Sequence, residues 1–162
     1  MSKQLLMLSG LCLFITACAS TPDFNLTGVE RKLTPNQVKA KPVQHKGKSV
    51  LWGGTILHGK NLKNKTRLEI LAYPLDEDGW PDRERKPLGR FLIHQAGYLE
   101  TASYAPGRLI SVVGTVSSLE KGKVGETRYT YPVIEATQHH LWPKSGRKSE
   151  SRVHFGIGVV FH

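Results

Sequence analysis

The side chains that could perform chemistry are few and are spread along the chain. Seven histidines occur, and an acidic run lies at residues 76–82. A metal site on strands needs ligands two residues apart or from neighbouring strands, whereas the adjacent His139 and His140 would point to opposite faces. The acidic run lacks the alternating ligands and the distal glutamate of an EF-hand loop, so we expect a solvated turn there. The sequence therefore predicts no metal and no other cofactor.

Nucleophilic catalysis finds little support in the sequence. The Gly-x-Ser-x-Gly motif of serine hydrolases is absent, and Gly122-x-x-Gly125 lies between two expected strands, whereas a phosphate-binding loop would open a helix. Two histidines and two serines could in principle form a base and nucleophile pair: His94, His139, Ser103 and Ser111. The sequence alone does not bring them together, so we expect a protein without enzymatic activity.

The cysteines carry the clearest chemical signal. Both lie within the first eighteen residues, at Cys12 and Cys18, so the rest of the chain has no thiol for a disulfide framework or a zinc site. An apolar run, Leu5–Ala17, follows Lys3 and is typical of a bacterial export signal. As a helix it would span roughly 20 Å, which is short for a membrane-spanning segment. The ending Ile15-Thr16-Ala17-Cys18 resembles the lipobox of bacterial lipoproteins.

A lipobox cysteine is a lipid attachment site. Its thiol is the most nucleophilic side chain at neutral pH, and it takes a diacylglycerol before the signal peptide is cut off. We expect residues 1–17 to be removed and Cys18 to carry two or three acyl chains, enough for stable anchoring. Ala19 follows, where an aspartate would favour retention in the inner membrane, so the outer membrane is the expected location. The alternative is an ordinary secretory signal beside a chance thiol.

The charge balance indicates an anionic partner. The 162 residues include 23 Lys or Arg and 13 Asp or Glu, a formal net charge of +10 in an otherwise average soluble composition. Nucleic acid is the first partner to consider. Aromatic and basic residues that would suit a single strand lie close in sequence: Tyr129, Tyr131, Lys121, Lys123 and Arg128. Export to the outer membrane argues against nucleic acid and favours anionic lipid headgroups, lipopolysaccharide, an acidic glycan or an envelope protein.

A small β domain is expected to position these residues. Five β-rich runs are separated by turn residues: 50–57, 66–75, 89–95, 108–119 and 127–141. Between the third and fourth runs, residues 97–107 indicate a helical turn that ends at Pro106-Gly107. The order predicts an all-β fold over residues 48–143, a small five- to six-stranded OB-like barrel with a short helix between strands three and four. An SH3-like barrel or an open meander also fits five such strands.

Polar segments flank this domain. Residues 18–47 are expected to form a lipidated N-terminus and tether, in which Thr34 caps a helical turn that begins at Pro35. Residues 144–162 are expected to form a basic linker and an amphipathic strand. The apolar face of that strand holds every second residue: Phe155, Ile157, Val159 and Phe161. The strand either pairs with an edge of the barrel or serves a partner strand or the membrane surface.

An ordered set of short motifs resembles one known family. The motifs are Trp52-Gly-Gly-Thr-Ile, Thr66-Arg-Leu-Glu-Ile, Gly89-Arg-Phe, Tyr104-Ala-Pro-Gly-Arg and Tyr129-Thr-Tyr-Pro-Val. Together with the lipobox, and in order and spacing over residues 18–143, they resemble the Slp family of starvation-inducible outer-membrane lipoproteins of Gram-negative bacteria. The resemblance implies a lipid-anchored, periplasm-facing β domain associated with starvation or envelope stress, without enzymatic activity or cofactor. Only Cys18 transfers as a functional residue.

Overall fold

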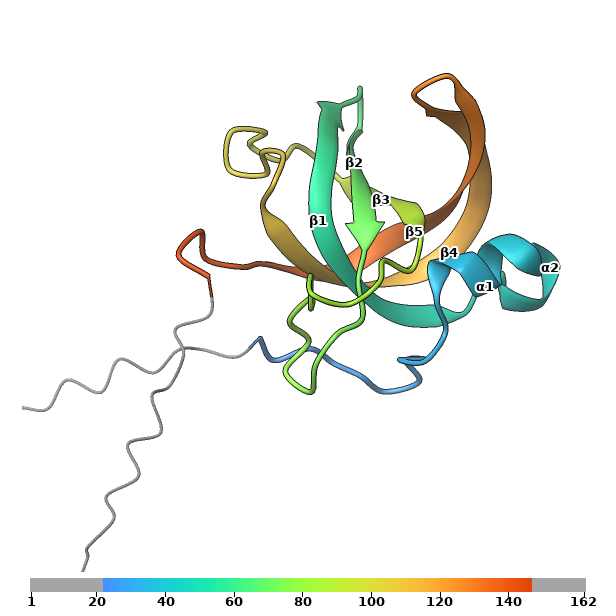
Figure 1. Ribbon diagram of the computed structural model, residues 1–162, viewed down its shortest axis with the longest axis horizontal. Coiled ribbons are helices and arrows are strands. Elements are labelled where there is room, and N and C mark those ends of the chain that lie inside the picture. The colour runs from blue at the N-terminus through green and yellow to red at the C-terminus, as the bar shows by residue number, and fades with distance from the viewer. Residues whose placement is uncertain (1–21, 147–162) are drawn as a thin grey trace, which may run out of the picture.

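Five strands form a sheet that closes on itself. The computed structural model describes residues 22–146, with strands β1 (Ser49–Asn61), β2 (Lys65–Ala72), β3 (Arg90–Ala96), β4 (Leu109–Val124) and β5 (Thr127–Leu141). They close into a barrel in the order β1-β2-β3-β5-β4 (Figure 1). Neighbouring strands are antiparallel except for β3 and β5, which pair in parallel. This arrangement confirms the predicted all-β, OB-like fold.

The longest pairing joins β4 to β5. β5 has the predicted bounds, whereas β4 continues past the predicted end at residue 119 to Val124. The extension follows from the turn, because only Gly125 and Glu126 separate the pair Val124 and Thr127. Gly125 has a φ of 56°, a left-handed conformation that two-residue hairpin turns require and glycine tolerates. The predicted Gly122-x-x-Gly125 connection is therefore a tight hairpin that projects from the barrel.

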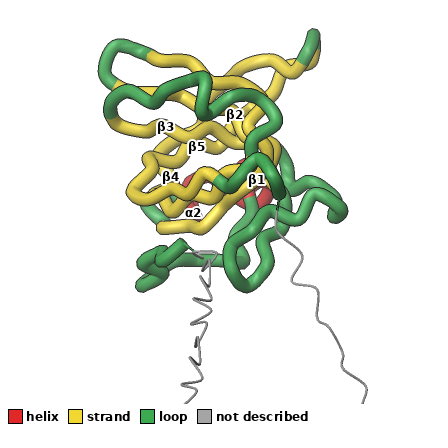
Figure 2. Tube along the Cα trace, turned by 90° about the vertical axis from the view of Figure 1, so that its left-hand side faces the viewer, coloured by secondary structure: helices red, strands yellow, loops and turns green. Residues whose placement is uncertain are grey.

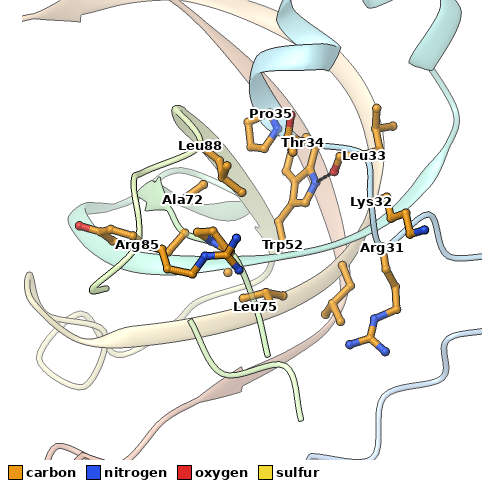
Figure 3. A pocket seen from close by; sticks show the side chains of 14 residues that line it. Arg31, Lys32, Leu33, Thr34, Pro35, Trp52, Ala72, Leu75, Arg85 and Leu88 are labelled. Carbon is orange, nitrogen blue, oxygen red and sulfur yellow. Dashed lines mark hydrogen bonds between the residues drawn. The ribbon is translucent and has the colours of Figure 1, made fainter. Parts of the chain in front are cut away.

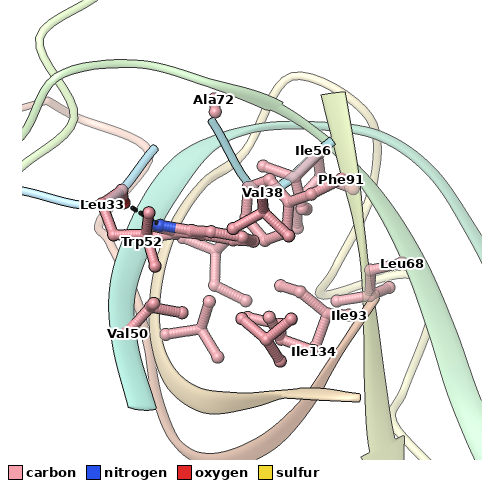
Figure 4. Close-up of a cluster of buried hydrophobic side chains, with 14 residues drawn as sticks. Leu33, Val38, Val50, Trp52, Ile56, Leu68, Ala72, Phe91, Ile93 and Ile134 are labelled. Carbon is pink, nitrogen blue, oxygen red and sulfur yellow. Dashed lines mark hydrogen bonds between the residues drawn. The ribbon is translucent and has the colours of Figure 1, made fainter. Parts of the chain in front are cut away.

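The barrel interior is filled by the inward-facing residues of all five strands (Figure 4). In β2 buried and partly buried residues alternate, so Leu68, Ile70 and Ala72 enter the core. Trp52 of β1 packs edge-on against Phe91 of β3, with 5.0 Å between the ring centroids. The Trp52 indole also donates from Nε1 to the carbonyl of Leu33 at 2.6 Å. One core residue thereby links the barrel to the segment that precedes it.

The segment that precedes β1, which belongs to the expected tether, packs against the barrel. It contains α1 (Pro35–Ala40) and α2 (Pro42–His45). Thr34 caps α1 as predicted, and Gln37 completes a capping box with it. Leu33 and Val38 are buried in the barrel core, and the backbone of Glu30 donates to the carbonyl of Ser49. The segment contains few large apolar residues, and Leu33 and Val38 are the two that dock the short helix on the barrel.

The helix expected between strands three and four is corrected. Residues 97–107 form turns, in which the amides of Ser103 and Tyr104 both donate to the carbonyl of Glu100, and no helix follows. Pro106 has no N–H with which to extend a helix, and Gly107 has a φ of 88°. The two short helices of the described chain both lie before β1, where α1 places Val38 in the barrel core.

Two glycines allow the strands to close together. A Cβ placed on Gly54 would overlap the carbonyl oxygen of Leu71 in β2, and one on Gly114 would lie 2.7 Å from the carbonyl oxygen of Glu135 in β5. Any side chain at these positions would push paired strands apart.

The two ends of the barrel differ in what they present. The segment that starts at residue 22 and the loop of residues 73–88 lie at one end, and the β1–β2 and β4–β5 hairpins lie at the other (Figures 1 and 2). Within residues 22–146, no helix has the length and apolar character needed to cross a membrane. Cys18 and the predicted strand face of Phe155, Ile157, Val159 and Phe161 lie outside the described residues.

Candidate functional site

The histidines predicted to diverge do so. His139 points toward the 97–107 turns, where its Nε2 lies 2.7 Å from the Tyr104 hydroxyl and its Nδ1 lies 3.1 Å from Gln95 Oε1. His140 instead packs its ring on Trp142, with 4.4 Å between the centroids. Burial, and then the neighbouring His140, lower the pKa of His139, and burial lowers the pKa of His140. Within residues 22–146, no group of three His, Cys, Asp or Glu side chains is placed to hold a metal ion.

The serines do not meet the histidines. Ser111 is buried, and its hydroxyl donates to the carbonyl of Gly79 while accepting from the Trp142 indole. His94 is also buried, and its Nδ1 lies 2.9 Å from Lys65 Nζ and 3.1 Å from Glu135 Oε1. Its Nε2 lies 3.1 Å from a carboxylate oxygen of Glu120 but makes no hydrogen bond. These partners tie strands together and leave neither residue paired as nucleophile and base.

The aromatic pair considered for base stacking is occupied with packing. The rings of Tyr129 and Tyr131 lie 4.7 Å apart, and Tyr131 is buried. The Tyr131 hydroxyl lies 3.2 Å from Glu69 Oε1 and 3.0 Å from the Lys123 carbonyl, two acceptors for its single hydrogen, and burial, followed by Glu69, raises its pKa. The Tyr129 hydroxyl accepts from the Arg90 amide. These rings support the β4–β5 hairpin and do not form an open stacking surface.

The acidic run forms a tight turn. The Asp76 carboxylate accepts from the Trp80 amide at 2.9 Å, and the Asp82 carboxylate accepts from the Glu84 amide at 3.0 Å. Gly79 occupies the turn with a φ of 84°. These hydrogen bonds shape the 73–88 loop, which forms one wall of a cavity.

A cavity of about 370 Å³ lies between the segment before α1 and this loop (Figure 3). Its floor is apolar and includes Leu51 and Trp52 of β1 together with Leu75 and Leu88 of the loop. This volume lies within the range of small-molecule sites in proteins.

Three cations stand around the cavity and no acidic residue lines it. Arg31 and Lys32 lie on one side and Arg85 on the other, with Trp52 and Leu75 between them (Figure 3). Arg31 Nη2 donates to the carbonyls of Asp76 and Glu77, at 3.3 and 3.2 Å, which orients its guanidinium. Lys32 and Arg85 are exposed and form no ion pair with another described residue. We call these residues, with the apolar floor, the basic pocket.

Sequence reasoning did not find the basic pocket. Arg31 and Lys32 fell in the predicted tether and Arg85 in a loop, 54 residues away from Arg31. Only the docking of the tether on the barrel brings the two sides together. The cationic cluster that the sequence did indicate was the basic linker at residues 144–152, and most of that segment lies outside the described residues.

A profile described as the outer membrane lipoprotein Slp family matches residues 15–159. The chain belongs to this family. Related sequences include the outer membrane protein Slp of Escherichia coli, 28% identical over 145 residues that cover 88% of this chain and 76% of the relative. The uncharacterized lipoprotein YeaY of the same species is 31% identical over 80% of this chain and 67% of the relative. A Haemophilus influenzae protein is 29% identical over 88% and 78%.

These relatives place this Slp-family protein among the outer-membrane lipoproteins of Gram-negative bacteria, as predicted. Among solved structures, a small single-stranded DNA-binding protein from Streptomyces coelicolor aligns with a TM-score of 0.39 and 15% identity, over 62% of this chain and 98% of its own. We draw no conclusion about ligands from a likeness of this extent.

Proposed function

We propose that this Slp-family protein is held in the outer membrane by lipid on Cys18, faces the periplasm, and acts there as a binding or organising module without enzymatic activity. The observation that carries this proposal is the short distance along the chain from the lipobox to the folded domain. Pro22, the first described residue, is four residues beyond Cys18. Four residues span at most about 14 Å.

Contacts with the barrel begin soon after Pro22. Phe24 lies against Gly79 of the loop, and the Asn25 amide donates to the Gln138 side chain in β5 at 2.9 Å. A lipidated Cys18 would therefore hold the domain close to the bilayer, with the residue-22 end of the barrel toward it. Such a placement suits a protein that works at the membrane surface.

The first test is replacement of the cysteine. In Cys18→Ser the protein should be lost from the outer-membrane fraction, while Cys12→Ser, a matched change inside the expected signal peptide, should leave it there. Retention of the Cys18→Ser protein in that fraction would exclude the anchor. Orientation is tested by adding protease to intact and to permeabilised cells, since a periplasm-facing domain is cut only after permeabilisation.

The association with starvation or envelope stress rests on the family resemblance and is also a proposal. We expect the amount of the protein per cell to rise when carbon is withdrawn. Immunoblots through exponential growth, starvation and recovery would measure it, and a constant level would contradict the proposal.

A second candidate function is recognition of an anionic ligand, and the specific observation in its favour is the basic pocket. Binding to the native state raises thermal stability, by an amount that grows with the logarithm of ligand concentration relative to the dissociation constant. The full-length protein in phosphatidylethanolamine vesicles should therefore unfold at a higher temperature when phosphatidylglycerol is included. An equal rise with zwitterionic phosphatidylcholine would argue against this candidate.

A further inference from the structure

We propose that the basic pocket binds the phosphate of an anionic phospholipid headgroup from the leaflet in which the protein is anchored. This deepens the second candidate function, and the choice of lipid as the source rests on the proposed anchor at Cys18. The pocket lies between the segment before α1 and the 73–88 loop (Figure 3), and both are at the end of the barrel where the described chain starts (Figure 1). A ligand in the membrane surface is therefore the one this cavity would meet most often.

The arrangement of cations suits a phosphate. Arginine presents several N–H donors in a plane, and lysine adds a mobile point charge. Arg31 is held by two loop carbonyls, and Arg85 faces it across the floor. A phosphate between them would receive charge-assisted hydrogen bonds from both walls, and Lys32 would add a third positive charge.

The floor of the pocket distinguishes a lipid from a free anion. Leu51, Leu75 and Leu88 offer apolar surface that inorganic phosphate would leave unused. A glycerol backbone beside the phosphate would cover that surface. Trp52 is fixed there by its hydrogen bond to Leu33, so the floor is already formed. The cavity volume of about 370 Å³ suits a headgroup better than whole acyl chains.

The surroundings make this recognition local. Between residues 76 and 86 the loop carries five carboxylates and three cations, so this wall is acidic as a whole. Non-specific electrostatic attraction between this loop and an anionic bilayer surface would therefore be weak. The positive charge is concentrated where the pocket opens, and we expect one headgroup to saturate it.

The decisive experiment uses full-length protein in neutral detergent, titrated with dihexanoyl phosphatidylglycerol. The chain has three tryptophans, so three indole N–H signals are expected in NMR spectra. The Trp52 signal should shift with saturation. The signals of Trp80 and Trp142, whose rings pack together away from the pocket floor, should stay in place. Dihexanoyl phosphatidylcholine should produce a much smaller shift.

Matched variants locate the site. Arg85→Gln and Lys32→Gln should each weaken binding about tenfold, the size expected for losing a charged hydrogen-bond donor. Lys123→Gln removes a cation that is also exposed but lies at the opposite end of the barrel, and it should leave the affinity unchanged. Equal losses in Arg85→Gln and Lys123→Gln would overturn the proposal, as would unchanged binding in the pocket variants.

The source of the ligand is tested in the same titration. Inorganic phosphate or oligogalacturonate that shifts Trp52 at the same concentration as the lipid would overturn the lipid assignment in favour of a free anion or an acidic glycan. Because the lipid is soluble and the protein is in detergent, the result does not depend on the anchor. Failure of the Cys18→Ser fractionation test and failure of headgroup binding are therefore separate outcomes.

Discussion

The hydroxyl of Tyr104 and Nε2 of His139 lie 2.7 Å apart and join the turns after β3 to the last strand of the barrel. The other ring nitrogen of His139 faces Gln95 Oε1 in β3. A neutral imidazole satisfies both contacts, since it donates to Gln95 and accepts from Tyr104. His139 thus holds the segment that takes the place of the expected helix.

Protonation of His139 should weaken this fold. Its pKa in the folded protein lies below the ordinary 6.5, chiefly because burial disfavours the charged ring. Between these two values the unfolded chain binds more protons, so stability is complete above pH 6.5 and falls as the pH drops through the folded-state pKa. Urea denaturation on both sides of pH 6.5 should show this loss. His139→Gln should reduce the loss, whereas His58→Gln, at an exposed position, should retain it.

Docking of α1 predicts a contrast between two valines. Val38→Ala removes a fully buried side chain and should lower the free energy of unfolding by about 2 kcal/mol. Val43→Ala, on α2, changes a side chain that is 90% exposed and should cost less than about 0.5 kcal/mol. Chemical denaturation of both variants measures the difference. Equal stabilities would mean that residues 29–47 do not pack on the barrel.

Closure of the barrel predicts a similar contrast between glycines of β1. Gly54→Ala should cost about 3 kcal/mol or more, because the new methyl group would overlap the backbone of Leu71. Gly59→Ala places its methyl group 3.0 Å from Leu68 Cδ2, a side-chain atom that has freedom to move. Its cost should be smaller. Thermal unfolding of both proteins checks the order, and the reverse order would contradict the closed pairing of β1 with β2.

The short connection to the anchor predicts an effect of its length. A long Gly-Ser insertion between Thr21 and Pro22 should leave the protein in the outer membrane but lower the effective concentration of headgroups at the pocket. In anionic vesicles, trypsin should then cleave faster after the exposed Arg83 and Arg85. An insertion of the same length between Gly146 and Arg147 is the control. Equal cleavage rates in the two proteins would show that the connection does not set the position of the domain.

The positions of the strands could be predicted from the sequence because the pattern that indicates a strand lies within a few consecutive residues. The alternation of apolar and polar residues around Leu68 and Ile70, and the turn residue Gly125, can each be recognised within a few residues of sequence. The order of the strands and turns favoured an OB-like barrel but left an SH3-like barrel and an open meander as alternatives, because the pairing of distant strands is not a local signal. The outer-membrane location was predicted from the lipobox that ends at Cys18 and from Ala19 directly after it.

The rest depended on contacts between distant residues. Val38 resembles any valine in a polar segment until the barrel interior is known to accept it. The basic pocket requires Arg31 and Arg85 on opposite walls. The sequence around each arginine does not show that the two lie close together in the fold. The net charge of the chain did not indicate the position of the pocket either, since the loop beside it is rich in acidic residues.

The length of β1 gives the barrel a further property. Its thirteen residues measure up to about 40 Å along a strand, and its far end carries the hairpin tip at Lys63. The tip of the β4–β5 hairpin, with Lys123, lies at that same end (Figures 1 and 2). With the proposed anchor at Cys18, the barrel would act as a spacer. It would hold the two lysine-bearing hairpin tips away from the bilayer, at a distance set by the length of the barrel.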